Sequence, residues 1–441
     1  MSRPFIEHPS ARYPLRVNRS LRAVLVGTFT LRLSTGLTGG LLIFYLRDLH
    51  VEPLTVAAFT ATFFAAELVL STPFGMLSDR VGHHRIMQVG PAFGAIAVVL
   101  TWSTTDLAAI GGTRLLEGAS TSASVPSILG FIAMVTAGDE LLRGRMAARF
   151  EGATLAGIGV GITAAGLLYD GIPGILPGLG RSAFLLNALI YGVSFLIYRF
   201  GVEPPPGEAA TLRSPHYGWR RYVALLTSSH VWLLAPTWIA INAALGLWTS
   251  QTIFQLIKEP DPRFANQMLM GGFVGAQIAF GLAVALVVFF AGLAFWGDRF
   301  KRFRRTTIIF FGILGGAVCV VAALAINHGG GQPDAVRALF GVAAAGGLFV
   351  LAGATPAALG LLADVSEAYP GDRGAIMGLY SVFLAVGQIV GSLVGGACAE
   401  KLGIDGILAA TLVLLVIAVA PLSRLRAFEH HVGVAPEVRT A

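Results

Sequence analysis

Four charged residues stand inside long apolar stretches of the sequence. They are Arg32, Glu67, Arg114 and Glu117. A charge at the centre of a membrane-spanning helix costs about 2.5 to 3.5 kcal/mol, so we expect these side chains to face a cavity or one another. Because Arg114 and Glu117 are three residues apart, they share one face of a helix. Two bases and two acids in such surroundings suggest ion pairs that can take up and release a proton.

The stretches that carry these charges are long enough to cross a membrane. The chain has 441 residues, of which 55% are hydrophobic and only 12% charged, whereas soluble domains are about 25% charged. A spanning helix needs ~20 apolar residues. The sequence predicts twelve such spans, at approximately 21–46, 55–77, 86–104, 107–137, 147–169, 183–199, 223–256, 272–296, 306–327, 335–363, 374–398 and 404–423.

The basic residues predict the orientation of these spans. An even number of spans puts both termini on one side, and most of the 31 Lys and Arg flank that side. Cytoplasmic loops carry the excess of positive charge, so both termini are predicted to be cytoplasmic. The formal charge of +7 is scattered over these loops, which indicates topology and excludes a nucleic-acid surface. The Arg-, Ala- and Gly-rich composition is typical of a prokaryote, and we expect the bacterial inner membrane.

An internal repeat divides the chain into two halves. Residues that match at an offset of 230 are Pro126 with Pro356, Gly130 with Gly360, Gly157 with Gly387, Gly161 with Gly391 and Gly166 with Gly396. Regularly spaced glycines let helices pack closely in lipid. We therefore predict an all-α membrane protein of two pseudo-symmetric six-helix bundles. Its segments are a tail at 1–22, a bundle at 23–200, a linker at 201–221, a bundle at 222–424 and a tail at 425–441.

The buried charges have no counterparts in the second half. In the repeat registers, Arg32 matches Asn242 and Arg114 matches Ala344. Aromatic and amide side chains take their place, and such groups suit a large, partly apolar ligand. The candidate substrate cavity of this half consists of Trp238, Asn242, Trp248, Gln251, Gln255, Gln277 and Gln388. The competing interpretation is ordinary packing with hydrogen bonds between helices.

The segment GMLSDRVGHHR at 75–85 resembles the signature loop of the major facilitator superfamily. The matching residues are Gly75, Asp79, Arg80, Gly82 and Arg85, with His83 at the first basic position. The second-half copy, AFWGDRFKRFRR, keeps Asp298 and Arg299. The resemblance implies the twelve-helix fold of that superfamily and a latch between the halves on the cytoplasmic side.

The resemblance also assigns roles to individual residues. In the latch, Asp79 would face the start of span eleven near Gly374, and Arg80 or Arg85 would pair with Asp139 or Glu140. Arg114, Glu117 and Gly118 resemble a second family motif, in which Arg is tied to proton coupling. Span five resembles the glycine-rich motif of the exporters, with Ile162 at the position of its proline. The chain is most similar in these features to bacterial drug and multidrug efflux members.

These observations leave two transport hypotheses open. The leading one is proton-coupled export of a lipophilic solute, such as a drug or lipid-like metabolite, with Glu67 or Glu117 carrying the proton. The alternative is symport of an anionic metabolite held by Arg32 and Arg114, since guanidinium groups bind carboxylate and phosphate bidentately. A receptor or scaffold with a transporter fold is a remote third possibility.

The expected partners of the chain are few. They are a small-molecule substrate, protons and membrane lipid, with a monomer as the expected state. We expect no enzymatic activity, cofactor, metal or nucleic acid, because the sequence contains no phosphate-binding glycine loop and no metal-ligand spacing.

Overall fold

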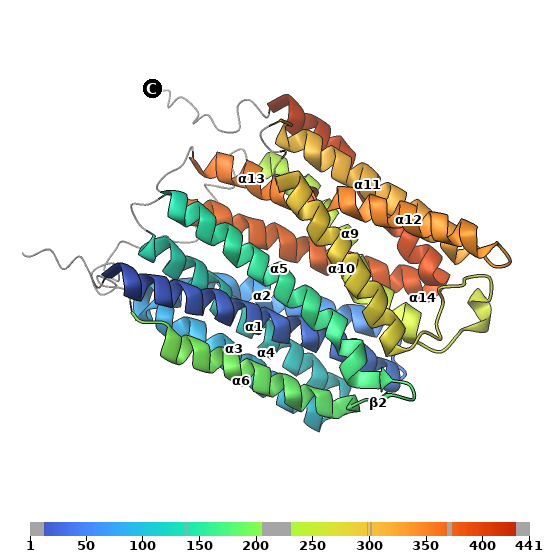
Figure 1. Ribbon diagram of the computed structural model, residues 1–441, viewed down its shortest axis with the longest axis horizontal. Helices are drawn as coiled ribbons and strands as arrows, with labels where there is room; N and C mark the ends of the chain where they lie inside the picture. Colours follow the sequence, from blue (N-terminus) through green and yellow to red (C-terminus); the bar gives the residue numbers. More distant parts are fainter. Residues whose placement is uncertain are drawn as a thin grey trace, which may run out of the picture. The chain divides into compact units, whose positions relative to one another are not determined.

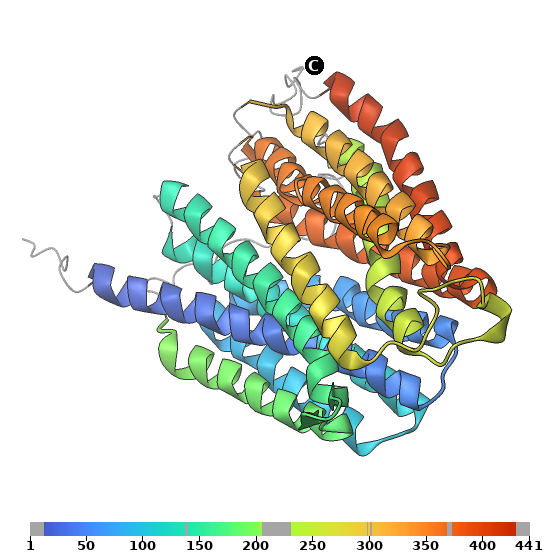
Figure 2. The same cartoon turned by 45° about the vertical axis from the view of Figure 1, so that its right-hand side comes forward.

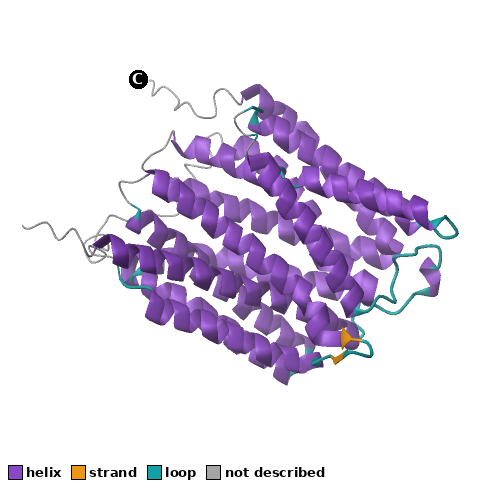
Figure 3. Cartoon of the chain, in the orientation of Figure 1, coloured by secondary structure: helices purple, strands orange, loops and turns teal. Residues whose placement is uncertain are grey.

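The computed structural model is almost entirely helical (Figure 1, Figure 3). It describes residues 13–136, 140–204, 231–297, 299, 302–367 and 373–428. Most of the predicted linker and most of each predicted tail lie outside these ranges.

Six long helices make up the described part of the first half. They are α1 (Tyr13–Asp48), α2 (Pro53–Val81), α3 (His83–Ser103), α4 (Leu107–Val135), α5 (Glu140–Asp170) and α6 (Ala183–Gly201). Between α5 and α6 the chain forms a short antiparallel hairpin, β1 (Gly171–Ile172) with β2 (Leu176–Pro177), and a 3-10 turn, η1 (Gly180–Ser182).

The second half continues this pattern. Its elements are α9 (Val231–Ile257), η2 (Pro262–Phe264), α10 (Gly275–Gly297), α11 (Arg305–Asn327), α12 (Asp334–Leu351), α13 (Ala354–Glu367) and α14 (Arg373–Phe428). The segment α14 is broken at Gly403, whose φ of 62° and ψ of −141° are not helical. Only glycine adopts such a backbone readily, so this residue separates two consecutive spans.

The helices are long and apolar enough to cross a membrane. Eleven described segments meet this criterion, and the last of them, Val382–Ala427, has 46 residues and contains the break at Gly403. Counting that segment as two gives the predicted twelve. The expected all-α, twelve-span architecture is confirmed. The predicted span 335–363 is interrupted by a turn at Ala352 and Gly353, between α12 and α13.

The chain divides into two compact units. Unit 1 comprises residues 1–41, 69–165 and 179–215, and unit 2 comprises residues 42–68, 166–178 and 216–441. Within unit 1, α3 packs against α4 and α6 (Figure 1). Within unit 2, α9 packs against α14, and α11 runs beside α12 (Figure 2). The end of α1, the start of α2 and the end of α5 therefore associate with the second half of the sequence.

The glycine repeat produces the same packing in both halves. A Cβ atom on Gly161 of α5 would lie 2.2 Å from the carbonyl oxygen of Leu33 in α1. A Cβ atom on Gly391 of α14 would lie 1.9 Å from the carbonyl oxygen of Ala243 in α9. Each pair of helices touches backbone to backbone, which only glycine allows. The close packing predicted for these glycines is confirmed.

Substitution of alanine in α5 should change stability in opposite directions at two glycines. Gly161→Ala should lower the melting temperature of the detergent-purified protein, because overpacking costs about 1 to 3 kcal/mol. Gly152→Ala should raise it slightly, because a Cβ there meets nothing within 4 Å and alanine is the better helix former by ~1 kcal/mol. Thermal unfolding of the two variants side by side makes the comparison. Equal melting temperatures would contradict the contact between α1 and α5.

Candidate functional site

A buried ion pair lies in the middle of α4. One guanidinium nitrogen of Arg114 donates to Oε2 of Glu117, and the exposed fractions of the two side chains are 8% and 3%. The i, i+3 spacing places both groups on one face of the helix. The second carboxylate oxygen, Oε1 of Glu117, is buried and has no hydrogen-bond partner among the described residues. This carboxylate can therefore accept one more proton or hydrogen bond.

A second buried base lies nearby in unit 1. Arg32 of α1 is 9% exposed and interacts electrostatically with Glu151 in the first half of α5. Sequence analysis did not select Glu151, because it stands near the end of a predicted span and close to several arginines. The glycine contact between α1 and α5 brings it toward Arg32: a Cβ atom on Gly157 would lie 2.8 Å from Cβ of Arg32.

Hydroxyl and amide groups surround these charges. Tyr191 of α6 is buried, and its phenol interacts with the hydroxyl groups of Thr35 and Thr38 and with the charges of Arg32 and Arg114. Asn187 of α6 donates to the Thr38 hydroxyl at 2.8 Å and to the Ser34 carbonyl oxygen at 3.1 Å. Helices α1, α4, α5 and α6 thus enclose a polar core that holds two bases and two acids.

Glu67, the fourth predicted charge, belongs to the other unit of the chain. It stands on α2 within residues 42–68, which belong to unit 2, and its side chain is half-buried. The structure brings together three of the four charged residues predicted from the sequence, and it adds Glu151 to them.

Most of the predicted cavity residues of the second half are buried on α9 and α14. Three of the seven make hydrogen bonds that account for their burial. The Asn242 amide donates to the Trp238 carbonyl oxygen at 2.9 Å, the Trp248 indole donates to the Thr411 hydroxyl at 2.9 Å, and the Gln251 amide donates to the Pro53 carbonyl oxygen at 3.1 Å. For Asn242 and Trp248, packing is a sufficient explanation, whereas the buried side-chain oxygen of Gln251 has no hydrogen-bond partner among the described residues.

Gln255 differs from its neighbours. Its side chain is fully buried, and neither its amide nitrogen nor its oxygen has a hydrogen-bond partner within the described ranges. A buried amide without partners is costly, so Gln255 is the strongest ligand-binding candidate on α9. Gln388 of α14 is also buried, and its oxygen accepts from Thr249 at a long 3.4 Å.

Gln277 has a local role at the start of α10. Its side chain is exposed in the first turn of α10, and its oxygen accepts from the backbone N–H of Val274 at 3.1 Å. Glutamine at this position commonly caps the start of a helix. Its predicted place in the substrate cavity stays a prediction.

The structure describes the predicted latch only in part. Gly82 has a φ of 110° and separates α2 from α3, and Arg80 and Arg85 are exposed. His83 is buried between Ser78, whose hydroxyl lies 3.1 Å from Nδ1, and Gly130. Gly75 faces Pro126, since a Cβ atom added to this glycine would lie 3.7 Å from the proline side chain.

The acidic members of the latch are not described. Asp139 and Asp298 lie outside the described residues, as do the side chains of Asp79 and Glu140. The predicted ion pairs of Arg80 and Arg85 stay predictions. In the second copy, the Arg299 guanidinium stacks 3.4 Å from the centroid of the Phe295 ring and donates to the Phe295 carbonyl oxygen at 3.0 Å.

A charged cluster that sequence analysis missed joins the end of α1 to the end of α5. The Arg47 guanidinium donates two hydrogen bonds of 2.9 Å to the Asp170 carboxylate and two more, of 2.8 and 3.0 Å, to Asp48. The Tyr169 hydroxyl donates to Asp48 at 2.7 Å. Asp170 also accepts from the backbone N–H of Gly275, the first residue of α10, at 3.0 Å. We name these five residues the Arg47 cluster.

The Arg47 cluster connects the two halves of the sequence within unit 2. Asp170 sits at the positive end of the α10 dipole, where a carboxylate is stabilised. Nearby, a Cβ atom on Gly166 would lie 2.4 Å from the carbonyl oxygen of Gly275. These charges stand at the ends of α1 and α5, just outside the predicted spans 21–46 and 147–169, so a search for charges inside spans did not find them.

The chain is similar in sequence to a known family and to known transport proteins over most of its length. A family model described as Major Facilitator Superfamily matches residues 24–289 and 264–437. The quinolone resistance protein NorA of Staphylococcus aureus strain MSSA476 is 21% identical over 387 residues, covering 86% of this chain and 90% of NorA. NorA of strain MRSA252 is 22% identical over 388 residues, with the same coverage.

Solved transporter structures share the fold. The crystal structure of the nucleoside transporter NupG superposes with a TM-score of 0.67 at 13% identity and covers 92% of this chain and 98% of its own. A bacterial homologue of the human lysosomal transporter Spinster, solved in an inward-facing and unoccupied conformation, gives a TM-score of 0.66 at 12% identity. That match covers 94% of this chain and 97% of the homologue.

The Arg114–Glu117 pair should behave as one energetic unit. Arg114→Gln or Glu117→Gln alone should destabilise the protein by about 3 to 5 kcal/mol, because each leaves an uncompensated buried charge. The double variant should lose much less than the sum. A double-mutant cycle on thermal unfolding in detergent measures this coupling.

The exposed pair of Arg337 and Asp334 on α12 is the matched control. It has the same i, i+3 spacing, with side-chain exposures of 36% and 93%. The same cycle there should give a coupling below about 1 kcal/mol. Additive effects of the two α4 substitutions would contradict the pair.

Proposed function

Because the chain belongs to the major facilitator superfamily, we propose that it is a proton-coupled exporter of a lipophilic small molecule that works by alternating access. It is a multi-pass membrane transporter. We infer that it resides in the bacterial plasma membrane with both termini in the cytoplasm, since most of the 31 Lys and Arg flank the side of the termini.

The observation that carries the proposal is the buried Arg114–Glu117 pair, with one carboxylate oxygen unpartnered among the described residues. Burial favours the neutral form of a carboxylate, and a neighbouring guanidinium favours the charged form. A helix movement that separates such a pair therefore changes the affinity of the acid for a proton. We assign Glu117 the central role, with Glu151 and Glu67 as further acids on the proton path.

The nature of the solute is inferred from the relatives and from α9. Relatives named for quinolone resistance cover 86% of the chain, which favours export of lipophilic, drug-like molecules. The indole rings of Trp238 and Trp248 and the amide of Gln255, which has no hydrogen-bond partner among the described residues, suit such a ligand better than a small ion.

Uptake of an anionic metabolite is the second candidate, and the likeness to a nucleoside transporter keeps it open. Arg32 and Arg114 are the groups that would bind the anion. Arg114 pairs with Glu117, and Arg32 interacts electrostatically with Glu151. Two acids balance two bases in this core, so little positive charge is left for an anionic substrate.

Transport by reconstituted protein tests the proposal. In proteoliposomes with an imposed pH gradient, wild type should accelerate efflux of a fluorescent lipophilic cation when the gradient is present. Glu117→Gln should lower the gradient-driven rate by ~10-fold or more, because a glutamine cannot carry the proton. Glu67→Gln and Glu151→Gln, alone and combined with it, show which acids share the path.

Glu259→Gln is the matched control, because Glu259 is exposed in the loop after α9 and should transport as wild type does. If the rate of transport depends neither on the pH gradient nor on the Glu67→Gln, Glu117→Gln double substitution, transport is not coupled to protons. If nucleosides or organic anions are accumulated and lipophilic cations are not, symport replaces export as the function.

The Arg47 cluster should hold its end of the transporter closed. In Asp170→Asn the charge-assisted bonds from Arg47 and Gly275 are weakened, and each is worth about 1.5 to 3 kcal/mol. Hydrogen–deuterium exchange of residues 44–52 and 166–178 should accelerate by ~10-fold or more. Asp106→Asn is the control, since Asp106 only caps α4 through the N–H of Ala109 and asparagine caps equally well. Unchanged exchange in Asp170→Asn would show that the cluster is not a lock.

A further inference from the structure

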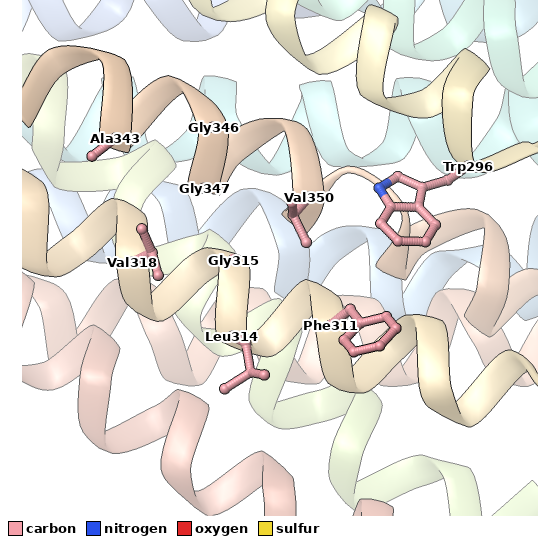
Figure 4. Close-up of a pocket in the computed structure, with 9 residues that line it drawn as sticks. All are labelled: Trp296, Phe311, Leu314, Gly315, Val318, Ala343, Gly346, Gly347 and Val350. Carbon is pink, nitrogen blue, oxygen red and sulfur yellow. The ribbon is translucent and has the colours of Figure 1, made fainter. Parts of the chain in front are cut away.

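An apolar groove opens between α11 and α12 in unit 2. It has a volume of about 460 Å³ and is lined by Trp296, Phe311, Leu314, Gly315, Val318, Ala343, Gly346, Gly347 and Val350 (Figure 4). Leu314 and Val318 are about half exposed. In a membrane-spanning chain, this side of α11 faces the surrounding hydrocarbon.

Glycines form the floor of this groove. A Cβ atom on Gly347 would lie 2.5 Å from the carbonyl oxygen of Gly315, so α11 and α12 touch there backbone to backbone. A Cβ atom on Gly346, one position away, would meet nothing within 4 Å. The missing side chains leave a channel along the helix pair that a flexible apolar chain can fill.

One end of the groove carries a buried polar atom. Trp296 is 7% exposed, and its indole nitrogen has no hydrogen-bond partner among the described residues. Figure 4 shows this nitrogen on the edge of the ring nearest Val350, beside the groove. An indole N–H buried in this way needs an acceptor, and a ligand in the groove can supply one.

Basic residues follow directly at the same end. Arg302 and Arg304 are exposed in the loop between α10 and α11, and Arg299 is held there on the Phe295 ring. Aromatic rings cluster at this end of the groove. The ring centroid of Trp296 lies 5.5 Å from that of Phe295 and 6.2 Å from that of Phe311. Such aromatic girdles and basic clusters occur where a helix leaves the hydrocarbon for the headgroup layer.

We propose that this groove is a binding site for an anionic phospholipid of the leaflet on the side of the α10–α11 loop. One acyl chain lies along Gly346 and Gly315, an ester carbonyl oxygen accepts from the Trp296 indole, and the phosphate meets Arg302 and Arg304. From the hydrocarbon outward, the site offers an apolar channel, then a single hydrogen-bond donor and then positive charge. A phospholipid has its acyl chain, ester carbonyl and phosphate in the same order. The residues of this site come from α10, α11, α12 and the loop between α10 and α11.

Native mass spectrometry of the purified full-length protein tests this assignment. The probes are phosphatidylglycerol and phosphatidylcholine of identical acyl chains, titrated into delipidated protein. Phosphatidylglycerol should bind more tightly. Gly346→Leu should weaken it ~10-fold or more by filling the channel, and Trp296→Phe about fivefold by removing one hydrogen bond. Arg302→Gln with Arg304→Gln should remove most of the preference for the anionic lipid, roughly 30-fold.

Gly341→Leu is the matched control, because Gly341 is also an exposed glycine of α12 where an added Cβ atom would meet nothing within 4 Å, yet it does not line the groove. It should bind phosphatidylglycerol as wild type does, and thermal unfolding shows that each variant is folded. Equal binding by Gly346→Leu and Gly341→Leu, or equal affinity for the two lipids, would overturn the proposal. So would loss of tetraphenylphosphonium binding in Gly346→Leu with lipid binding intact, since the groove would then be a solute site.

Discussion

Direct contact between helix backbones is the constraint on which the rest of this structure depends. In hydrocarbon, helices gain nothing from burying apolar side chains against one another, so they associate through close packing and a few polar contacts. Gly161 on Leu33 and Gly391 on Ala243 provide this packing at matching positions of the two halves. Each fixes the first helix of its half against the fifth, and the side chains of these helices then point into the polar core or the α9 wall.

The two halves use this shared frame for different chemistry. In unit 1 the α1–α5 contact brings Arg32 toward Glu151, and α4 adds the Arg114–Glu117 pair. The corresponding wall on α9 holds amides and indoles, and Asn242, Trp248 and Gln251 donate hydrogen bonds to neighbouring backbone or hydroxyl groups. Among the described residues of this core each base has an acid as its neighbour, because an isolated ion in such surroundings is too costly.

Sequence alone predicts the parts of this architecture that are periodic. Hydropathy predicts the spans, and the repeat locates the packing glycines, because both signals extend over many residues. The position of Glu151 beside Arg32 depends on how two distant helices cross, and nothing local reports it. The capping bond of Gln277 to Val274 depends on the residue at which α10 begins, and the apolar sequence of this segment does not mark that residue. The groove beside Gly346 likewise needs the register of α11 against α12, which no single segment encodes.

The Arg47 cluster shows how far the repeat constrains function. At the offset of 230, Asp170 matches Glu400, so each half has an acid at the same end of its fifth helix. The bases differ: Arg47 binds Asp170 directly, whereas Lys258, the nearest base at the end of α9, interacts electrostatically with Asp261 and Glu52. The half that carries the buried charges is also the half whose arginine fastens α5, and through the N–H of Gly275 the start of α10. A substitution that loosens the contact between α1 and α5 would therefore disturb the polar core and the Arg47 cluster together.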